Sequence, residues 1–259
     1  MVVGVAVGLL AAACGATGDR TAASSDTSRD VSPDGGVVAD ATAAEIPDLS
    51  DAADRAVVVA TAACGSADPT DGSGIALGPE RVLTAAHVVA SGGPIELTDD
   101  DATVAGVLVA YDPARDLAIV RPAEPFQGIP PPPLSGDLDV DDTGIVVGAA
   151  RSGDVPAVVE LVTVIEMDDV RATTRSRRRG YRIDANTGPG DSGAGLYDDD
   201  GRLIGLLFAV SSADDDRSWV TASSEIDAFL DDPSTVGTFA CDPDRSRVAP
   251  AADGTQPAG

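Results

Sequence analysis

Lysine is absent from this sequence, and all 17 basic residues are arginines. Aspartate and glutamate together number 43, so the formal net charge is -26 at pH 7. Nucleic acids and anionic lipid surfaces are bound through basic faces, so this charge excludes nucleic acid as a partner and electrostatic docking to such lipids. Acidic runs such as Asp198-Asp199-Asp200 lack the alternating ligand spacing of a calcium loop and indicate exposed turns.

Aromatic residues are also scarce, at 3% of the chain, although 43% of the residues are hydrophobic. A buried core must therefore be built mainly from Val, Ala, Leu and Ile. The 28 glycines and 18 prolines are typical of short strands joined by turns and argue against a helical bundle. The length of 259 residues is enough for one good-sized domain with appendages.

The apolar segment Val2–Ala13 has 12 residues, too few to cross a bilayer, which takes ~20. Its length suits the apolar region of a secretory signal. The ending Leu10-Ala11-Ala12-Ala13-Cys14 resembles a bacterial lipoprotein signal in which Cys14 is lipidated, although the leucine lies four residues before the cysteine and no basic residue precedes the segment. The alternatives are an ordinary signal cleaved near Ala13 and the end of a longer anchor. We therefore expect an exported protein, periplasmic or on the cell surface, either tethered to the membrane through Cys14 or secreted.

Cysteine is rare, and besides Cys14 the chain has only Cys64 and Cys241. An even pair in an exported chain indicates a disulfide. A bond between Cys64 and Cys241 would connect the first strand region to the end of the domain. Closing so long a loop would stabilise the domain by roughly 4–5 kcal/mol in the chain-entropy account. The alternative is two buried free thiols.

Composition divides the chain into four parts. Residues 1–14 form the signal or lipoprotein-type segment, and residues 15–50, rich in Ala, Ser, Thr, Asp and Gly, are predicted to be a disordered linker. Residues 51–242 form the folded domain. Residues 243–259 have a composition like that of the linker and are predicted to be a disordered tail.

Apolar runs within the domain are short and are separated by turn signals such as Asp71-Gly72. The segment Ser223–Asp231 has helical periodicity. The proline run Pro130–Pro133 is expected to be a stiff, extended connection between two halves. The pattern predicts an all-β barrel or sandwich with a short C-terminal helix. The predicted strands are Ala56–Ala63, Ser73–Leu77, Arg81–Thr84, Ile95–Leu97, Thr103–Tyr111, Leu117–Arg121, Gly144–Val147, Val158–Ile165, Tyr181–Ala185, Gly195–Tyr197, Leu203–Val210 and Trp219–Thr221.

A single histidine, His87, ends the small-residue segment Thr84-Ala85-Ala86. It is the only imidazole that this chain offers as a general base. A base of this kind needs an acid that fixes its tautomer. Asp116 opens an apolar strand, where its carboxylate can be held partly buried. The competing acid, Asp112, precedes a proline and is typical of a turn.

Ser192 lies in the glycine-rich run Gly188–Gly193. A serine hydroxyl is a poor nucleophile near neutral pH and needs a base within hydrogen-bond reach. Gly190 and Gly193 permit backbone angles that strain other residues. Such a turn can direct the backbone N–H groups of Gly190 and Ser192 to one point, an oxyanion hole for a tetrahedral intermediate. This chemistry requires no metal and no cofactor.

These residues carry a family resemblance. The segments TAAH, DLA and GDSG, which contain His87, Asp116 and Ser192 in that order, resemble the three signature segments of the trypsin-like, chymotrypsin-fold serine proteases. The similarity covers roughly residues 56–241, and Gly72–Leu77 resembles the GSGF segment of bacterial members. The proline run, Tyr111-Asp112-Pro113 and the end of the domain resemble actinobacterial periplasmic proteases that are tethered to the membrane.

The resemblance implies two perpendicular six-stranded antiparallel β-barrels, with His87 and Asp116 in the first and Ser192 in the second. It implies a serine endopeptidase that cleaves protein or peptide substrates through an acyl-enzyme on Ser192. His87 would be the base and Asp116 the orienting acid. The resemblance to the membrane-tethered periplasmic proteases also implies the Cys64–Cys241 bond. We expect a monomer.

The chain departs from the family pattern directly after the nucleophile, where Ala194 and Gly195 replace the usual glycine and proline. We expect a backbone adjustment there, with a catalytically weakened binding or scaffold protein of the cell envelope as the alternative. The arginines between Arg175 and Arg182 are expected to form an exposed loop leading into a strand. By resemblance the substrate pocket admits a small or medium apolar side chain and is formed by Asn186, Phe208, Ala209 and Val210.

Overall fold

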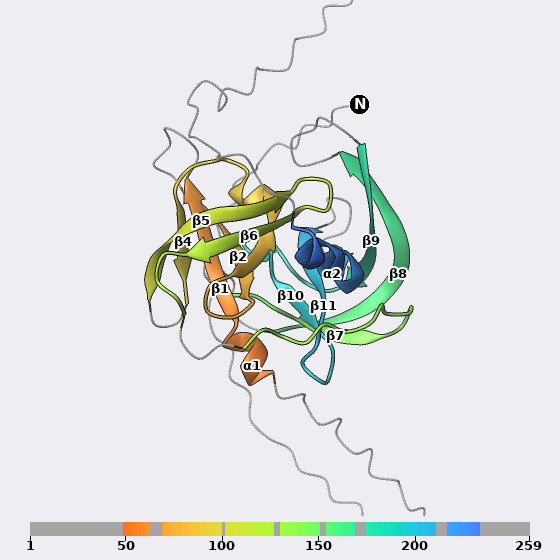
Figure 1. The fold of residues 1–259 in the computed structure, drawn as a ribbon. Helices are drawn as coiled ribbons and strands as arrows, with labels where there is room; N and C mark the ends of the chain where they lie inside the picture. The colour runs from red at the N-terminus through yellow and green to blue at the C-terminus, as the bar shows by residue number, and fades with distance from the viewer. Residues whose placement is uncertain are drawn as a thin grey trace, which may run out of the picture. The chain divides into compact units, whose positions relative to one another are not determined.

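The computed structural model describes residues 49–62, 69–99, 102–126, 130–150, 154–168, 175–210 and 217–233. These residues form two six-stranded antiparallel β-barrels (Figure 1), which confirms the expected all-β fold. The first barrel contains β1 (Ala56–Ala62), β2 (Pro69–Ala76), β3 (Val82–Ala85), β4 (Ile95–Thr98), β5 (Thr103–Asp112) and β6 (Leu117–Pro122). The second contains β7 (Thr143–Val147), β8 (Val155–Asp168), β9 (Arg175–Asp184), β10 (Gly195–Tyr197), β11 (Leu203–Val210) and β12 (Arg217–Ala222).

Both barrels close in the same order of pairing. The first runs β1-β2-β3-β6-β5-β4 and returns to β1. The second, read from its first strand, runs β7-β8-β9-β12-β11-β10 and returns to β7. In β1, alternate residues are buried, as a strand with one face on a core requires. The cores are mainly aliphatic, with Val57, Leu83 and Ile183 fully buried. The scarcity of aromatic residues is therefore met by branched aliphatic packing.

The C-terminal helix α2 spans Ser223–Asp231, the range that its periodicity predicts. Its side chains Ile226 and Phe229 are fully buried in a core cluster that contains residues of both barrels. Two further helices, α1 (Ser50–Ala53) and the 3-10 helix η1 (Ala86–Val89), are missing from the sequence prediction. Each has four residues, too short for a periodic signal. Among the helices of the described ranges, none is long and apolar enough to cross a membrane.

The prediction of an exposed loop at the arginine cluster is wrong. The segment from Arg175 onward belongs to β9, which pairs with β8 along its length up to Asp168 opposite Arg175. Alternate residues of β9 are buried, among them Arg178, which is 2% exposed. The sequence prediction missed this part of the strand because a run of arginines indicates an exposed segment, and charged residues are rarely fully buried. In Figure 1, β8 and β9 form the long hairpin at the right of the fold.

The predicted turn at Asp71-Gly72 is also wrong, because both residues lie within β2 and pair with β1. A Cβ atom on Gly72 would lie 2.7 Å from the side chain of Val88. The glycine therefore permits close packing and marks no turn. The proline run lies in the connection between the barrels, where the carbonyl of Pro133 accepts the N–H of Leu203 at 2.8 Å.

Several expectations fall outside the described residues. The signal segment, most of the linker and the tail are among them, together with Cys14, Cys64 and Cys241. Lipidation, the disulfide and the domain boundaries therefore stay predictions.

Candidate active site

His87 and Asp116 come together at one end of the first barrel. His87 lies in η1, directly after β3, and Asp116 immediately precedes β6. These two strands are paired, with Ala85 opposite Leu117, and the N–H of Ala86 donates to the carbonyl of Asp116 at 3.1 Å. The sheet register therefore places the two side chains next to each other.

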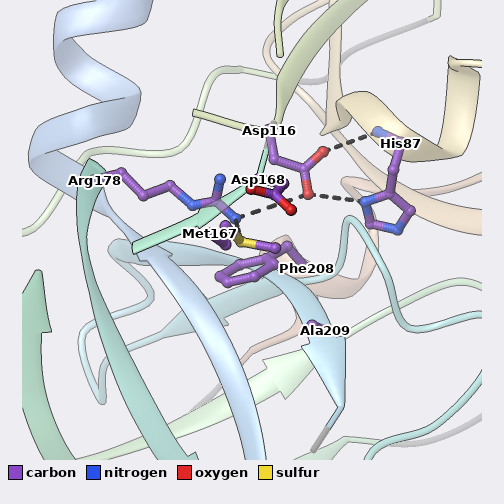
Figure 2. A pocket seen from close by; sticks show the side chains of 7 residues that line it. All are labelled: His87, Asp116, Met167, Asp168, Arg178, Phe208 and Ala209. Atoms are coloured by element: carbon purple, nitrogen blue, oxygen red, sulfur yellow. Dashed lines mark hydrogen bonds and ion pairs between the residues drawn. The ribbon is translucent and has the colours of Figure 1, made fainter. Parts of the chain in front are cut away.

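Both carboxylate oxygens of Asp116 contact His87 (Figure 2). Oδ1 accepts the backbone N–H of His87 at 2.9 Å, and Oδ2 lies 2.9 Å from the imidazole Nδ1. The Asp116 side chain is 5% exposed and the imidazole 36%. Because the neutral imidazole donates its Nδ1–H to the carboxylate, Nε2 is left as a proton acceptor. This is the geometry of a base oriented by a buried acid.

Asp112, the competing acid, caps the turn that leads to Asp116. Its Oδ1 accepts the N–H groups of Ala114 and Arg115 at 2.9 and 3.0 Å. Arg115 also pairs with Asp112 at 2.6 Å and with Glu225 of α2 at 2.8 Å, and these hydrogen bonds raise the pKa of Arg115. The fixed turn holds Asp116 in the left-handed region, with φ of 57°, which non-glycine residues seldom adopt.

Ser192 lies on the turn between β9 and β10. Within this turn the Asp191 carboxylate accepts the N–H of Gly188 at 2.8 Å, and the Asp191 N–H donates to the Gly188 carbonyl at 3.0 Å. Gly190 and Gly193 have φ of 98° and 91°. Both values lie in the region that favours glycine, so these residues allow the tight turn that the sequence predicts.

The backbone N–H groups of Gly190 and Ser192 are free to bind an oxygen. Within the part of the chain that the structure describes, neither group donates a hydrogen bond. Both residues are partly exposed. Two unpaired donors on one tight turn are what a developing oxyanion needs.

Ser73 of β2 connects the first barrel to this turn, and sequence analysis missed its role. Its N–H donates to the carbonyl of Ser192 at 2.8 Å, and its hydroxyl donates to the carbonyl of Gly190 at 2.9 Å. The hydroxyl also accepts the N–H groups of Ala149 and Ala150 at 3.2 and 3.3 Å. Ser73 is fully buried, so the turn that carries Ser192 is anchored to the barrel that carries His87.

Ser192 and His87 are not joined by a hydrogen bond within the described ranges. The elements that carry them are nevertheless neighbours. A Cβ atom on Gly72 would lie within 3.0 Å of both the Val88 side chain and the Ser192 carbonyl oxygen. Val88 follows His87 in η1, so the elements that carry His87 and Ser192 meet over β2. Catalytic hydrogen bonds are often long until substrate binds.

A cavity of about 240 Å³ opens beside the imidazole (Figure 2). Phe208 and Ala209, both expected in the substrate pocket, line it. Asn186 and Val210 are exposed and do not line it, so their part in substrate binding stays a prediction. The complete lining is His87, Asp116, Met167, Asp168, Arg178, Phe208 and Ala209.

Three of these residues, Met167, Asp168 and Arg178, were not predicted for the site. They come from the β8–β9 hairpin, and only the packing of the two barrels brings them to His87. The signal that could have found Arg178 is the alternation of Ser176, Arg178 and Gly180, which places them on one face of a strand.

No group of three or more His, Cys, Asp or Glu side chains within the described ranges could hold a metal ion.

Comparisons with known proteins agree with this geometry. Residues 72–206 match the family described as "Trypsin-like peptidase domain". Over 181 residues the chain is 31% identical to serine protease Rv3671c of Mycobacterium tuberculosis, covering 66% of this chain and 45% of the relative. Over 175 residues it is 30% identical to the chloroplastic protease Do-like 2 of Arabidopsis thaliana, covering 65% of this chain and 29% of that protein. The chain therefore spans less than half the length of these relatives.

Solved structures agree with the fold. The crystal structure of the Rv3671c protease from M. tuberculosis in its active form superposes with a TM-score of 0.65 at 26% identity, covering 73% of this chain and 86% of the other. The inactive form of the same protease gives a TM-score of 0.60 at 25% identity, covering 71% and 90%. Both similarities extend over most of the described residues.

Proposed function

This chain belongs to the trypsin-like peptidase domain family, and on that premise we propose that it is an exported serine endopeptidase acting on protein or peptide substrates. The reaction is peptide-bond hydrolysis through an acyl-enzyme on Ser192. His87 is the general base and Asp116 the acid that orients it. The observation that carries the proposal is the two-point contact between the buried Asp116 carboxylate and His87.

Acylation begins when Nε2 of His87 takes the proton of the Ser192 hydroxyl. The oxygen attacks the carbonyl carbon of the scissile bond, and the carbonyl oxygen becomes an oxyanion. The N–H groups of Gly190 and Ser192 stabilise that charge without reorganising. The imidazolium then gives its proton to the leaving amine, and the C–N bond breaks.

Deacylation repeats these steps with water as the nucleophile. His87 takes a proton from the water, whose oxygen attacks the acyl carbon, and the imidazolium returns a proton to the Ser192 oxygen as the ester bond breaks. Asp116 stays ionised throughout and stabilises the imidazolium that forms in each half of the reaction. The free acid product and the unmodified serine result.

Fluorophosphonate labelling tests this proposal. Wild-type domain should be labelled at Ser192, while Ser192→Ala and His87→Ala should lose the label, because the serine oxygen or its base is removed. His87→Ala is a clean test because the chain has no second imidazole. Ser224→Ala, an exposed serine of α2, is the matched control and should label like wild type. Wild-type protein that is folded and unlabelled would reject the protease function and favour the binding or scaffold alternative.

Packing around Ala194 and Gly195 supports catalysis over that alternative. Ala194 is fully buried, and its N–H donates to the carbonyl of Asp191 at 2.9 Å. A Cβ atom on Gly195 would lie 2.5 Å from the ring of Tyr197. Both residues therefore fit the core behind the nucleophile turn, and the turn keeps its glycine conformations.

Export and attachment belong to the same proposal. The apolar segment before Cys14 supports export, with lipidation of Cys14 as the anchor and a Cys64–Cys241 disulfide in the oxidising compartment. Cys14→Ser should release the protein from membranes.

Mass spectrometry without reduction should find Cys64 and Cys241 in one linked peptide pair, and two free thiols in exported protein would exclude the bond.

A further inference from the structure

Arg178 is a buried cation directly behind the proposed acid. It projects from β9 of the second barrel, and its side chain is 1% exposed. The guanidinium donates from Nη1 to the carbonyl of Ala114 at 3.1 Å and from Nη2 to the sulfur of Met167 at 3.1 Å. It also lies 4.0 Å from the centre of the Phe208 ring (Figure 2).

The charge of Arg178 has no close carboxylate partner among these contacts. Its nearest ion pair is with Oδ2 of Asp116 at 4.0 Å, beyond hydrogen-bond length, and its Nε is buried without a partner. Burial lowers the pKa of Arg178, although Asp116, Glu225 and Asp112 oppose the shift. Arginine nevertheless stays protonated in proteins. A buried charge without a close partner is costly, and an apolar residue of similar volume would avoid that cost.

We propose that Arg178 is a positioning residue for the His87–Asp116 pair. Its Nη1 holds the carbonyl of Ala114, so it fixes the turn that keeps Asp116 in its strained conformation. Its charge faces the oxygen of Asp116 that also accepts Nδ1–H of His87. One buried guanidinium therefore orients Asp116 from the opposite barrel and adds positive electrostatic potential at the imidazole.

Other charged groups surround this pair, and most are compensated. Asp112 and Glu225 both pair with Arg115 on the far side of the turn. Asp168 of β8 lines the cavity but is exposed, so solvent screens its charge. Arg178 is therefore the buried positive charge nearest to the Asp116 carboxylate in the described residues. Its removal should let the imidazole accept a proton at higher pH.

Because the chain has a single histidine, the effect of Arg178 on the imidazole can be measured without an activity assay. The titration midpoint of the imidazole is followed by NMR in folded wild type, Arg178→Met and Arg178→Lys, and no assignment among histidines is needed. We expect Arg178→Met to move the midpoint upward by about half a unit or more, because a nearby cation is lost. Arg178→Lys keeps the charge and should stay close to wild type.

Arg177→Met is the matched control. It removes the same formal charge from the adjacent position, but Arg177 is 70% exposed and pairs with Glu166 at 3.0 Å. It should leave the midpoint in place. A midpoint that does not rise in Arg178→Met, that rises equally in Arg177→Met, or that rises equally in Arg178→Lys would overturn the proposal. If the Met variant does not fold, Arg178→Gln, which keeps donors and loses the charge, takes its place.

Kinetics test the positioning itself, and this part rests on the proposed function. Arg178→Met should lower kcat about tenfold or more with little change in KM, since a small displacement of catalytic groups is costly. The acidic limb of the rate profile should move to higher pH, and Arg178→Lys should recover part of the rate. An unchanged kcat in Arg178→Met would overturn the inference. Wild type that resists fluorophosphonate labelling would instead reject the protease function, while the NMR result would still decide the role of Arg178.

Discussion

One oxygen of the Asp116 carboxylate accepts Nδ1–H of His87 and so fixes the imidazole in one tautomer, while the other accepts the backbone N–H of His87. An amide cannot replace this carboxylate. In Asp116→Asn the charge that stabilises the imidazolium is lost, and the amide can present a donor where His87 needs an acceptor. We expect kcat to fall roughly 10³- to 10⁴-fold with a smaller change in KM. Steady-state kinetics on a peptide substrate would measure this.

Asp199→Asn is the control for that substitution. Asp199 lies on the exposed turn between β10 and β11, and its loss removes the same charge without touching the site. It should retain wild-type kcat. If Asp116→Asn stays within tenfold of wild type, another acid orients His87 and the assignment of Asp116 is wrong.

At the scale of elements, the nucleophile turn depends on a close approach between the barrels. A Cβ atom on Gly193 would lie 1.9 Å from the carbonyl oxygen of Ser73, and its φ is 91°. Gly193→Ala must therefore displace backbone as well as strain it, and we expect a loss of at least about 3 kcal/mol in the free energy of unfolding. Denaturant titration of the folded domain would measure the loss.

Gly201→Ala separates strain from collision. Gly201 has φ of 71°, but a Cβ atom there would meet nothing within 4 Å. It should cost about 1–2 kcal/mol, the usual penalty of a left-handed non-glycine residue. Equal losses in the two variants would show that the contact with Ser73 has no energetic weight.

Glu160 connects three strands of the second barrel through ion pairs. Its carboxylate lies 2.7 Å from Arg217 of β12 and 3.0 Å from Arg182 of β9. The hydrogen bond from Arg217 contributes most to lowering the pKa of Glu160 below 4.5. A lowered folded-state pKa means that the stabilisation is present above the unfolded value and is lost as pH falls through the folded value.

Glu160→Gln should therefore lower Tm at pH 7, and the difference from wild type should shrink as the pH falls below about 4. Thermal melts across pH would measure it. Glu166→Gln, whose partner Arg177 is 70% exposed, is the control and should change Tm less. A Glu160→Gln difference that is constant from pH 7 to pH 3 would mean that ionisation of Glu160 does not contribute to stability.

How far the sequence predicts this molecule depends on the range of each interaction. Short apolar runs on either side of the turn signal Asp200-Gly201 locate β10 and β11 at their observed bounds. The local order of Asp112, a proline and Asp116 is enough to tell the turn former from the carboxylate that contacts His87. Ser73 and Arg178 escape prediction because their roles arise only where the two barrels pack. A serine in a GSG segment carries no local sign of burial, and the alternation that places Arg178 on one face with Ser176 and Gly180 is obscured by the neighbouring arginines.

For the whole molecule, the proposed function predicts that the net charge of -26 without a single lysine influences which peptides reach the site. A strongly acidic protein attracts cationic substrates and repels anionic ones over a distance set by the Debye length, ~30 Å at 0.01 M salt and ~8 Å at 0.15 M. Two peptides with the same residues at the scissile bond, one with arginines and one with aspartates at a distant end, should therefore differ in kcat/KM at low salt. The ratio should fall toward one as salt is raised, with the change in kcat/KM and not in kcat, because the field acts on association. A neutral peptide of the same core is the control and should respond weakly to salt. A ratio that does not depend on salt would assign the preference to direct contacts in the cleft and leave the acidic surface without a role in substrate capture.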